Sequence, residues 1–206
     1  VESLGERVAS EPVSTLVAES YDPCPIPDAP APEDPEVLLA VTGLSKVFPG
    51  RRRGFGALPD VRAVENVTFT VKRGRTLGIV GESGSGKTTT GRTLLRLQEP
   101  TAGEVIFEGE DLLAAGPERL RTLRAKMQIV FQDTYASLDP RWTIGRTLAE
   151  PLTLHTELTP EQIRARVAEV LTTVGLEEGH AERFPHEFSG GQRQRIGIAR
   201  ALVLNP

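Results

Sequence analysis

Eight consecutive residues from Gly81 to Thr88 have the types and spacing of a loop that binds phosphate groups. They read Gly-Glu-Ser-Gly-Ser-Gly-Lys-Thr, so a lysine and a threonine follow three glycines. Glycines let the backbone turn so that successive N–H groups converge on phosphate oxygens. The Lys87 ammonium can neutralise β- and γ-phosphates, and the Thr88 hydroxyl can ligate the Mg²⁺ that bridges them. These residues predict a site for the triphosphate of a nucleotide.

The segments on either side of the loop fit this interpretation. Residues 76–80 form a continuous apolar run of the kind found in a buried parallel strand, and they lead directly into Gly81. Residues 88–97 are predicted to form a helix that carries three leucines and stops before Pro100. The N-terminus of such a helix carries a partial positive charge. The alternative is a glycine-rich turn that opens a helix and binds nothing.

A polar residue follows a second apolar run. Residues 127–131 are predicted to form another buried strand, and Gln132 and Asp133 come directly after it. Ligand sites in α/β proteins form at the carboxyl ends of parallel strands. Gln132 could therefore reach Mg²⁺ or a water molecule; the alternative is a surface residue that caps the strand.

A third feature resembles the first, because a small polar turn again opens a helix. Ser189-Gly190-Gly191-Gln192 precedes the amphipathic stretch from Arg193 to Leu202. The exposed N–H groups of its first turn could accept a second anion. The chain thus has two helix starts suited to phosphate.

Together, these three features resemble the ATP-binding subunit family of ABC transporters, over about residues 37–206. The signature of that family usually reads Leu-Ser-Gly-Gly-Gln, and Phe188 replaces the leucine here. The resemblance implies an α/β fold. It would have the RecA-like core of a P-loop NTPase, an antiparallel β part and an inserted helical subdomain at about 133–192, and would be incomplete at the C-terminus.

The resemblance also implies the ligands and their residues. ATP and Mg²⁺ would bind, with Lys87 and Gln132 in catalytic roles and Thr88 and Gln132 near the metal. The turn that starts at Ser189 would act in trans, closing over ATP held by the phosphate loop of a second subunit. The full nucleotide-binding set is Gly81, Glu82, Ser83, Gly84, Ser85, Gly86, Lys87, Thr88, Thr89, Phe48, Ser189, Gly190, Gly191 and Gln192. Phe48 is included because the family stacks an aromatic residue, usually tyrosine, on adenine.

The sequences of residues 130–141 and 184–189 resemble those of the dipeptide and oligopeptide importer branch of the family. This implies an ATP-binding subunit at the cytoplasmic face of the membrane, which couples ATP hydrolysis to import of peptides or related solutes. The implied partners are a second ATPase domain, two membrane permease subunits and an extracytoplasmic substrate-binding protein. Residues 133–148 would contact the permease; the alternative for any one of them is ordinary packing.

Two other functions remain open at this stage. One is a soluble ABC ATPase that acts on nucleic acid or the ribosome, and the other is an inactive ATP-binding fragment. Residues 37–206 carry a net charge of only +4, and the arginine run 51–53 has no aromatic neighbour beyond Phe55, so no nucleic acid partner is expected.

The ends of the chain differ from the family pattern. Family members continue beyond the signature helix into a strand that ends in Asp-Glu, whereas this chain ends at Pro206. We therefore expect a fragment that lacks the catalytic glutamate of a transport-coupled ATPase, and its own turnover stays open. Residues 1–36 carry a net charge of −8 and seven of the sixteen prolines, which predicts an acidic linker or tail, such as a join between two fused ATPase halves.

Composition limits what else the chain can be. Its 206 residues, 38% of them hydrophobic, are enough for one sizeable core. The single cysteine, Cys24, excludes an internal disulfide, and a metal site there would need thiols supplied from elsewhere. The three histidines, His155, His180 and His186, lack metal-ligand spacing and are assigned no chemistry.

One helix of the predicted subdomain can be located from local signals alone. Thr159 is a favourable N-cap, Pro160 suits the first helical position, and Gln162 completes a capping box. Gly175 should end the helix. Its predicted core face consists of Ile163, Val167, Val170, Leu171 and Val174.

Overall fold

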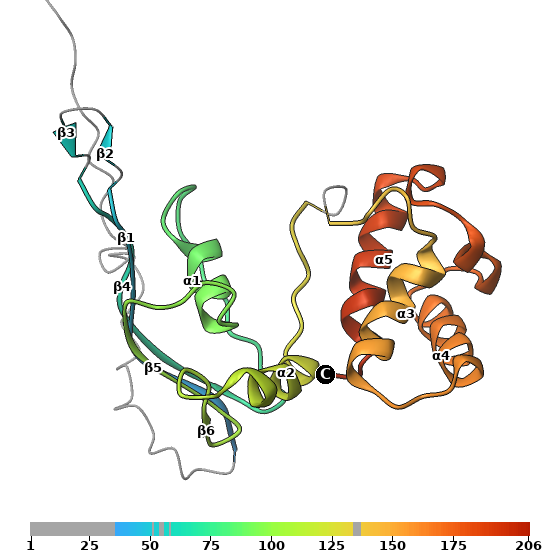
Figure 1. Cartoon of the computed structure of the whole chain (residues 1–206), viewed down its shortest axis with the longest axis horizontal. Coiled ribbons are helices and arrows are strands. Elements are labelled where there is room, and N and C mark those ends of the chain that lie inside the picture. Colours follow the sequence, from blue (N-terminus) through green and yellow to red (C-terminus); the bar gives the residue numbers. More distant parts are fainter. Residues whose placement is uncertain (1–35, 51, 54–55, 58, 134–136) are drawn as a thin grey trace, which may run out of the picture. The chain divides into compact units, whose positions relative to one another are not determined.

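The computed structural model describes residues 36–50, 52–53, 56–57, 59–133 and 137–206. The chain divides between Ala115 and Gly116 into two compact units, which are treated separately below (Figure 1). The predicted acidic linker, including Cys24, lies outside the described residues except for Glu36.

The first unit is built on an antiparallel sheet. Its strands, in order across the sheet, are β4 (Val61–Lys72), β1 (Val37–Phe48), β5 (Ala102–Phe107) and β6 (Glu110–Asp111). A separate two-stranded sheet pairs β2 (Arg52–Arg53) with β3 (Gly56–Ala57). Figure 1 shows β1 and β4 as the long strands of this unit. The apolar run Val37–Val41 lies within β1, and Phe69 lies within β4.

Helix α1 (Lys87–Leu94) lies against β1 and β4 in the same unit. Thr90 and Thr93 are buried there, and their hydroxyls donate to carbonyl oxygens of α1 itself, at 3.1 and 2.8 Å. A hydroxyl satisfied inside its own helix can be buried at little cost. The buried apolar residues of this unit are Ala40, Val41, Leu44, Val64, Val105, Phe107 and Leu112.

Helix α1 ends three residues earlier than the sequence predicted. Arg96 has a positive φ of 50°, and the N–H groups of Arg96 and Leu97 donate back to the carbonyls of Thr93 and Arg92. This pair of bonds around a left-handed residue is a Schellman motif, which terminates a helix. Leu97 is consequently 47% exposed rather than part of a helical face.

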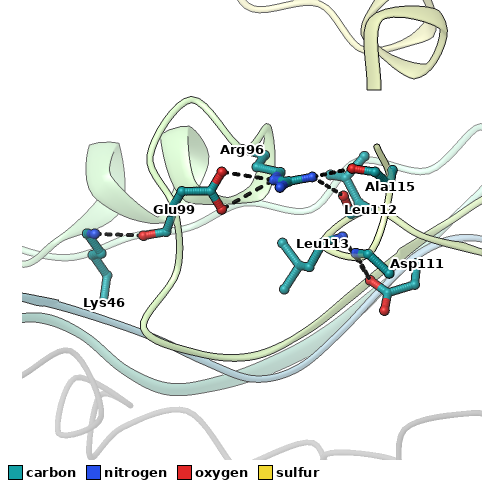
Figure 2. A network of polar contacts seen from close by, with 8 residues as sticks. Lys46, Arg96, Glu99, Asp111, Leu112, Leu113 and Ala115 are labelled. Carbon is teal, nitrogen blue, oxygen red and sulfur yellow. Dashed lines mark hydrogen bonds and ion pairs between the residues drawn. The ribbon is translucent and has the colours of Figure 1, made fainter. Parts of the chain in front are cut away.

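The side chain of Arg96 fixes this end of α1 (Figure 2). Its Nε donates to both carboxylate oxygens of Glu99, at 3.0 and 3.2 Å. Its Nη1 donates to the carbonyl oxygens of Leu112 and Ala115, at 3.3 and 2.6 Å. Lys46 on β1 adds a bond from Nζ to the Glu99 carbonyl, at 2.6 Å. The far end of α1 is therefore tied to β1 and to the segment after β6.

Two sequence predictions about strands are wrong for this structure. Residues 76–80 and 127–131 were expected to be buried parallel strands, but neither segment is in a strand. Val80 is 88% exposed and Val130 is 47% exposed. A parallel strand needs hydrogen-bonded partners beside it. All strand pairs among the described residues are antiparallel, and none includes these segments.

The second unit is helical. Its helices are α2 (Pro117–Lys126), α3 (Ile144–His155), α4 (Pro160–Thr173) and α5 (Gly190–Leu202), with short 3₁₀ helices η2 (Glu178–Glu182) and η3 (Pro185–Glu187). Helices α3, α4 and α5 pack against one another, as Figure 1 shows, and their side chains form one core. Its buried residues are Leu138, Ile144, Leu148, Leu152, Val167, Val170, Leu171, Leu176, Phe188, Ile196, Ala199 and Val203.

The predicted helix after Thr159 is confirmed as α4. The Thr159 hydroxyl accepts from the N–H of Gln162, and the Gln162 side chain accepts from the N–H of Thr159. The predicted face also holds, because Val167, Val170 and Leu171 are buried and Ile163 and Val174 pack against the core. Gly175, which follows the helix, has a positive φ of 71°.

Gly103 allows β5 to approach β1 closely. A Cβ atom at this position would lie 2.5 Å from the Cα of Leu44. We expect Gly103→Ala to lower the free energy of unfolding by about 2 kcal/mol more than Gly109→Ala, since overpacking adds to the backbone strain. Gly109 is the matched control, with a positive φ of 79° and open space around its Cβ position. Urea denaturation followed by circular dichroism would measure both, and equal losses would contradict the close approach.

Candidate phosphate-binding site

The residues from Gly81 to Gly86 form a loop that opens α1. Gly84 and Gly86 have φ angles of 87° and 90°, in the left-handed region that favours glycine. The N–H of Ser85 donates to the carbonyl of Glu82 at 3.3 Å, which closes a tight turn. Gly86 is the N-cap of α1, and the N–H of Thr90 donates to its carbonyl at 2.8 Å.

The first turn of α1 is suited to an anion. The first N–H groups of any helix have no carbonyl within that helix to which they can donate. Gly86 has no side chain with which to cap them, and the first turn contains no acidic residue. Backbone donors and the positive end of the helix dipole therefore meet at Gly86, Lys87 and Thr88.

The side chain of Lys87 folds back over this loop. Its Nζ donates to the carbonyl oxygens of Gly81 and Glu82, at 2.8 and 2.5 Å, and to the hydroxyl of Ser85, at 3.2 Å. These acceptors are neutral. Phosphate oxygens are charged and would form stronger hydrogen bonds with the same ammonium. The lysine thus lies over the loop that opens α1.

The other loop residues vary in exposure. Glu82, Ser83 and Thr88 are exposed, whereas Thr89 is half-buried and its carbonyl accepts from Thr93. A hydroxyl such as that of Thr88 is a hard oxygen ligand, which is the type that Mg²⁺ prefers. Within the described ranges, no group of three or more His, Cys, Asp or Glu residues could hold a metal ion.

The second predicted site lies at the start of α5. Ser189 caps this helix, because its hydroxyl accepts from the N–H of Gln192 at 3.3 Å. The Gln192 side chain returns a bond by accepting from the N–H of Ser189 at 2.9 Å. This capping box uses two of the first N–H groups and leaves those of Gly190 and Gly191 without a partner in the helix. Both glycines are exposed, with open space at their Cβ positions.

Two predicted site residues belong to other segments of the chain. Gln132 is exposed and lies outside any strand, in the second unit, whereas the phosphate loop belongs to the first. Phe48 is half-buried at the end of β1, and Nζ of Lys46 lies 5.1 Å from the centre of its ring. Its stacking on adenine stays a prediction.

Arg200 was missed by the sequence analysis. It lies on α5, one turn after buried Ile196, and its Nη1 donates to the carbonyl of Ser137 at 2.6 Å. Burial lowers the pKa of its guanidinium, and the charge of Glu150 partly offsets this. A basic residue on the apolar face of the helix was the available signal. The side chain links α5 to the segment that follows Gln132.

The same segment contains an ion pair between Arg141 and Asp139. Arg141 donates to the Asp139 carboxylate from its guanidinium, at 2.8 and 3.0 Å, and from its backbone N–H, at 3.0 Å. These bonds lower the pKa of Asp139 to about 2, so the carboxylate is ionised at neutral pH.

Within the described ranges, no helix has both the length and the apolar character needed to cross a bilayer.

Comparison with known proteins gives consistent matches. An oligopeptide transport ATP-binding protein of Bacillus subtilis, AppF, is 50% identical over 83% of this chain. A glutathione import ATP-binding protein of Escherichia coli, GsiA, is 53% identical over 84% of this chain. The chain spans only 53% and 28% of the lengths of these two relatives.

Solved structures agree on the fold. A dimeric ATP-binding cassette in a post-hydrolysis state with ADP and Pi is 32% identical, with a TM-score of 0.69, over 82% of this chain and 70% of its own. The cbiO1 structure of Clostridium perfringens, part of an ABC transporter complex, is 25% identical, with a TM-score of 0.65, over 83% of this chain and 63% of its own. The predicted fold class is confirmed by these cassettes.

Residues 64–206 match the family model described as ABC transporter. This match covers more than half of the chain, so the chain belongs to the ABC transporter family.

Proposed function

We propose that this chain is the ATP-binding part of an import ATPase. Residues Gly81 to Thr89 hold the triphosphate of ATP, and the Ser189–Gln192 turn of a second copy or a homologous domain closes over it. ATP binding and hydrolysis then drive the import of peptides or related solutes. Two permease subunits and an extracytoplasmic binding protein complete the transporter, with this chain at the cytoplasmic face of the membrane.

One observation carries most of the proposal: the glycine loop ends in a helix start with no side-chain cap, and a lysine ammonium bonds to oxygens of the same loop. The N-cap, Gly86, offers no side-chain acceptor, and Lys87 donates only to neutral oxygens of the loop. Three or more unpaired donors beside a positive charge fit a polyanion better than they fit solvent.

Mg²⁺ fits the same site as a partner of the phosphates. Thr88 would hold it through its hydroxyl, and Gln132 is the second proposed ligand. The ion would neutralise charge on the β- and γ-phosphates. The role of this chain's own residues is to bind and orient: the loop N–H groups fix the phosphates, and the Lys87 ammonium lies beside them.

The names of the relatives support an importer rather than an ATPase that acts on nucleic acid. They are an oligopeptide transport protein and a glutathione import protein, and both are called ATP-binding. Glutathione is itself a small peptide. We therefore propose short peptides or similar solutes as the transported class.

Substitution of the loop lysine tests ATP binding. We expect Lys87→Ala to raise the Kd for ATP by at least about tenfold, because a hydrogen bond to a charged group contributes roughly 1.5–3 kcal/mol. Displacement of a fluorescent ATP analogue, in the presence of Mg²⁺, would measure this change. Lys126→Ala, in the last turn of α2, is the matched control and should bind as the wild type does. Equal affinity in the two variants would rule out the loop as the ATP site.

Mixing two variants tests the arrangement in trans. Lys87→Ala damages the phosphate loop, and Gly191→Glu damages the second turn by placing a carboxylate where phosphate would bind. An acidic residue in the first helical turn favours the helix, so Gly191→Glu should still fold. We expect neither variant alone to dimerise with ATP and Mg²⁺. An equimolar mixture should dimerise, since each mixed pair contains one complete site.

Size-exclusion chromatography with light scattering would follow this association. Gly179→Glu adds the same charge at another exposed glycine of the second unit and should dimerise normally. A mixture that stays monomeric, beside a wild type that dimerises, would show that the two turns do not combine across subunits.

A further inference from the structure

His180 is a buried histidine that none of the chemistry above uses. It is only 7% exposed and lies in η2. Its ring meets the ring of Phe188 edge to face, with the centroids 5.3 Å apart and the planes at 83°. Edge-to-face contact between rings is directional, so it fixes orientation as well as distance.

The hydrogen bonding of His180 fixes its ring. Nδ1 accepts from the backbone N–H of Glu177 at 3.1 Å, so this nitrogen carries a lone pair and no proton. The backbone N–H of His180 donates in turn to the Glu177 carbonyl at 3.0 Å. The imidazole is therefore held by the first turn of η2.

The element that carries His180 is itself held firmly. η2 packs against α3 and α4, and Ala181 contacts the core of the second unit. Gly145 on α3 makes room for it, because a Cβ at that position would lie 3.0 Å from the Ala181 carbonyl oxygen. The ring of His180 is therefore attached to a 3₁₀ helix that is packed against two α-helices.

Phe188 connects η2, through its contact with His180, to the Ser189 turn. Phe188 is 4% exposed, belongs to the core, and immediately precedes the N-cap of α5. A hydrophobic residue before an N-cap often packs beside the helix and so fixes the angle at which the chain enters it. Phe188 is packed in the core in this way, directly before the turn that carries the free N–H groups of Gly190 and Gly191.

We propose that His180 is a positioning residue for the Ser189–Gln192 turn. Its ring contacts the ring of Phe188 edge to face, and Phe188 fixes the angle at which the chain enters α5. This inference rests on the proposed function for the role of the turn in closing over ATP. It also gives a reason for Phe188 at a position where the family usually has leucine, since leucine has no ring to meet the imidazole.

Three variants separate the parts of this contact. His180→Asn can keep an acceptor for the Glu177 N–H while removing the ring. Phe188→Leu keeps an apolar side chain in the core and removes the other ring. His186→Asn is the matched control, because His186 is exposed and stacks on Phe184 rather than on Phe188.

The direct measurement is NMR hydrogen exchange at the backbone amides of Ser189 and Gln192 in the full chain. Both amides donate within the capping box. We expect exchange to be about fivefold faster in His180→Asn and Phe188→Leu, the factor that matches loss of a typical cap. The double variant should be no faster than either single one, because both act through one contact. Exchange in α4 should not change.

ATP-dependent dimerisation is the functional measurement. We expect the Kd for dimerisation to rise about tenfold in both variants, while the affinity of the phosphate loop for ATP stays as in the wild type. A purely structural role would instead speed up exchange in α3, α4 and α5 as much as at Ser189 and Gln192, which would overturn the proposal.

The two hypotheses fail in different ways. If the wild type does not dimerise with ATP, the proposed function fails, and the exchange data alone decide the role of His180. If exchange at Ser189 and Gln192 is unchanged in a folded Phe188→Leu chain, the positioning role is wrong, whatever the dimerisation result. Should His180→Asn not fold, Phe188→Leu still gives this answer.

Discussion

The backbone N–H groups at the start of two helices are the constraint on which the site depends. A helix cannot satisfy its own first donors, and α1 and α5 each begin at an exposed turn of small residues. In α1 the glycine N-cap leaves these donors to an outside anion, and Lys87 adds a full positive charge. In α5 a capping box satisfies two donors and leaves those of the two glycines. The two turns therefore differ in how many backbone donors they leave for the proposed phosphate groups.

The rest of each unit holds one of these helix starts in place. In the first unit, α1 rests on the antiparallel sheet, and the Arg96 contacts fix its far end. In the second unit, the core holds α5, Arg200 ties it to Ser137, and Phe188 leads the chain into it. Each helix is held along its length by packing and at its end by a few directed polar contacts. Only the first turn is left free to bind.

The sequence predicted the features that depend on residues close together in the chain, such as helix caps and the apolar faces of helices. The cap at Thr159 was found because a threonine followed by a glutamine three residues later forms bonds within four residues. The apolar face of α4 was found from the helical spacing of its apolar residues. The strands at 76–80 and 127–131 were predicted wrongly because a parallel strand depends on partners distant in sequence, and periodicity does not reveal them. The contacts of Arg96 and Arg200 were missed for the same reason, because these side chains bond carbonyl oxygens between 16 and 63 residues away.

The central claim is that phosphate binds at these two helix starts, and the backbone amides report it directly. NMR spectra of the isotope-labelled chain, recorded as ATP and Mg²⁺ are added, would give the result residue by residue. The account predicts the largest shifts at Gly86, Lys87, Thr88 and Thr89, followed by Gly190 and Gly191 at concentrations where the chain dimerises. Shifts that are absent from residues 86–89, or that cluster elsewhere in the chain, would contradict it.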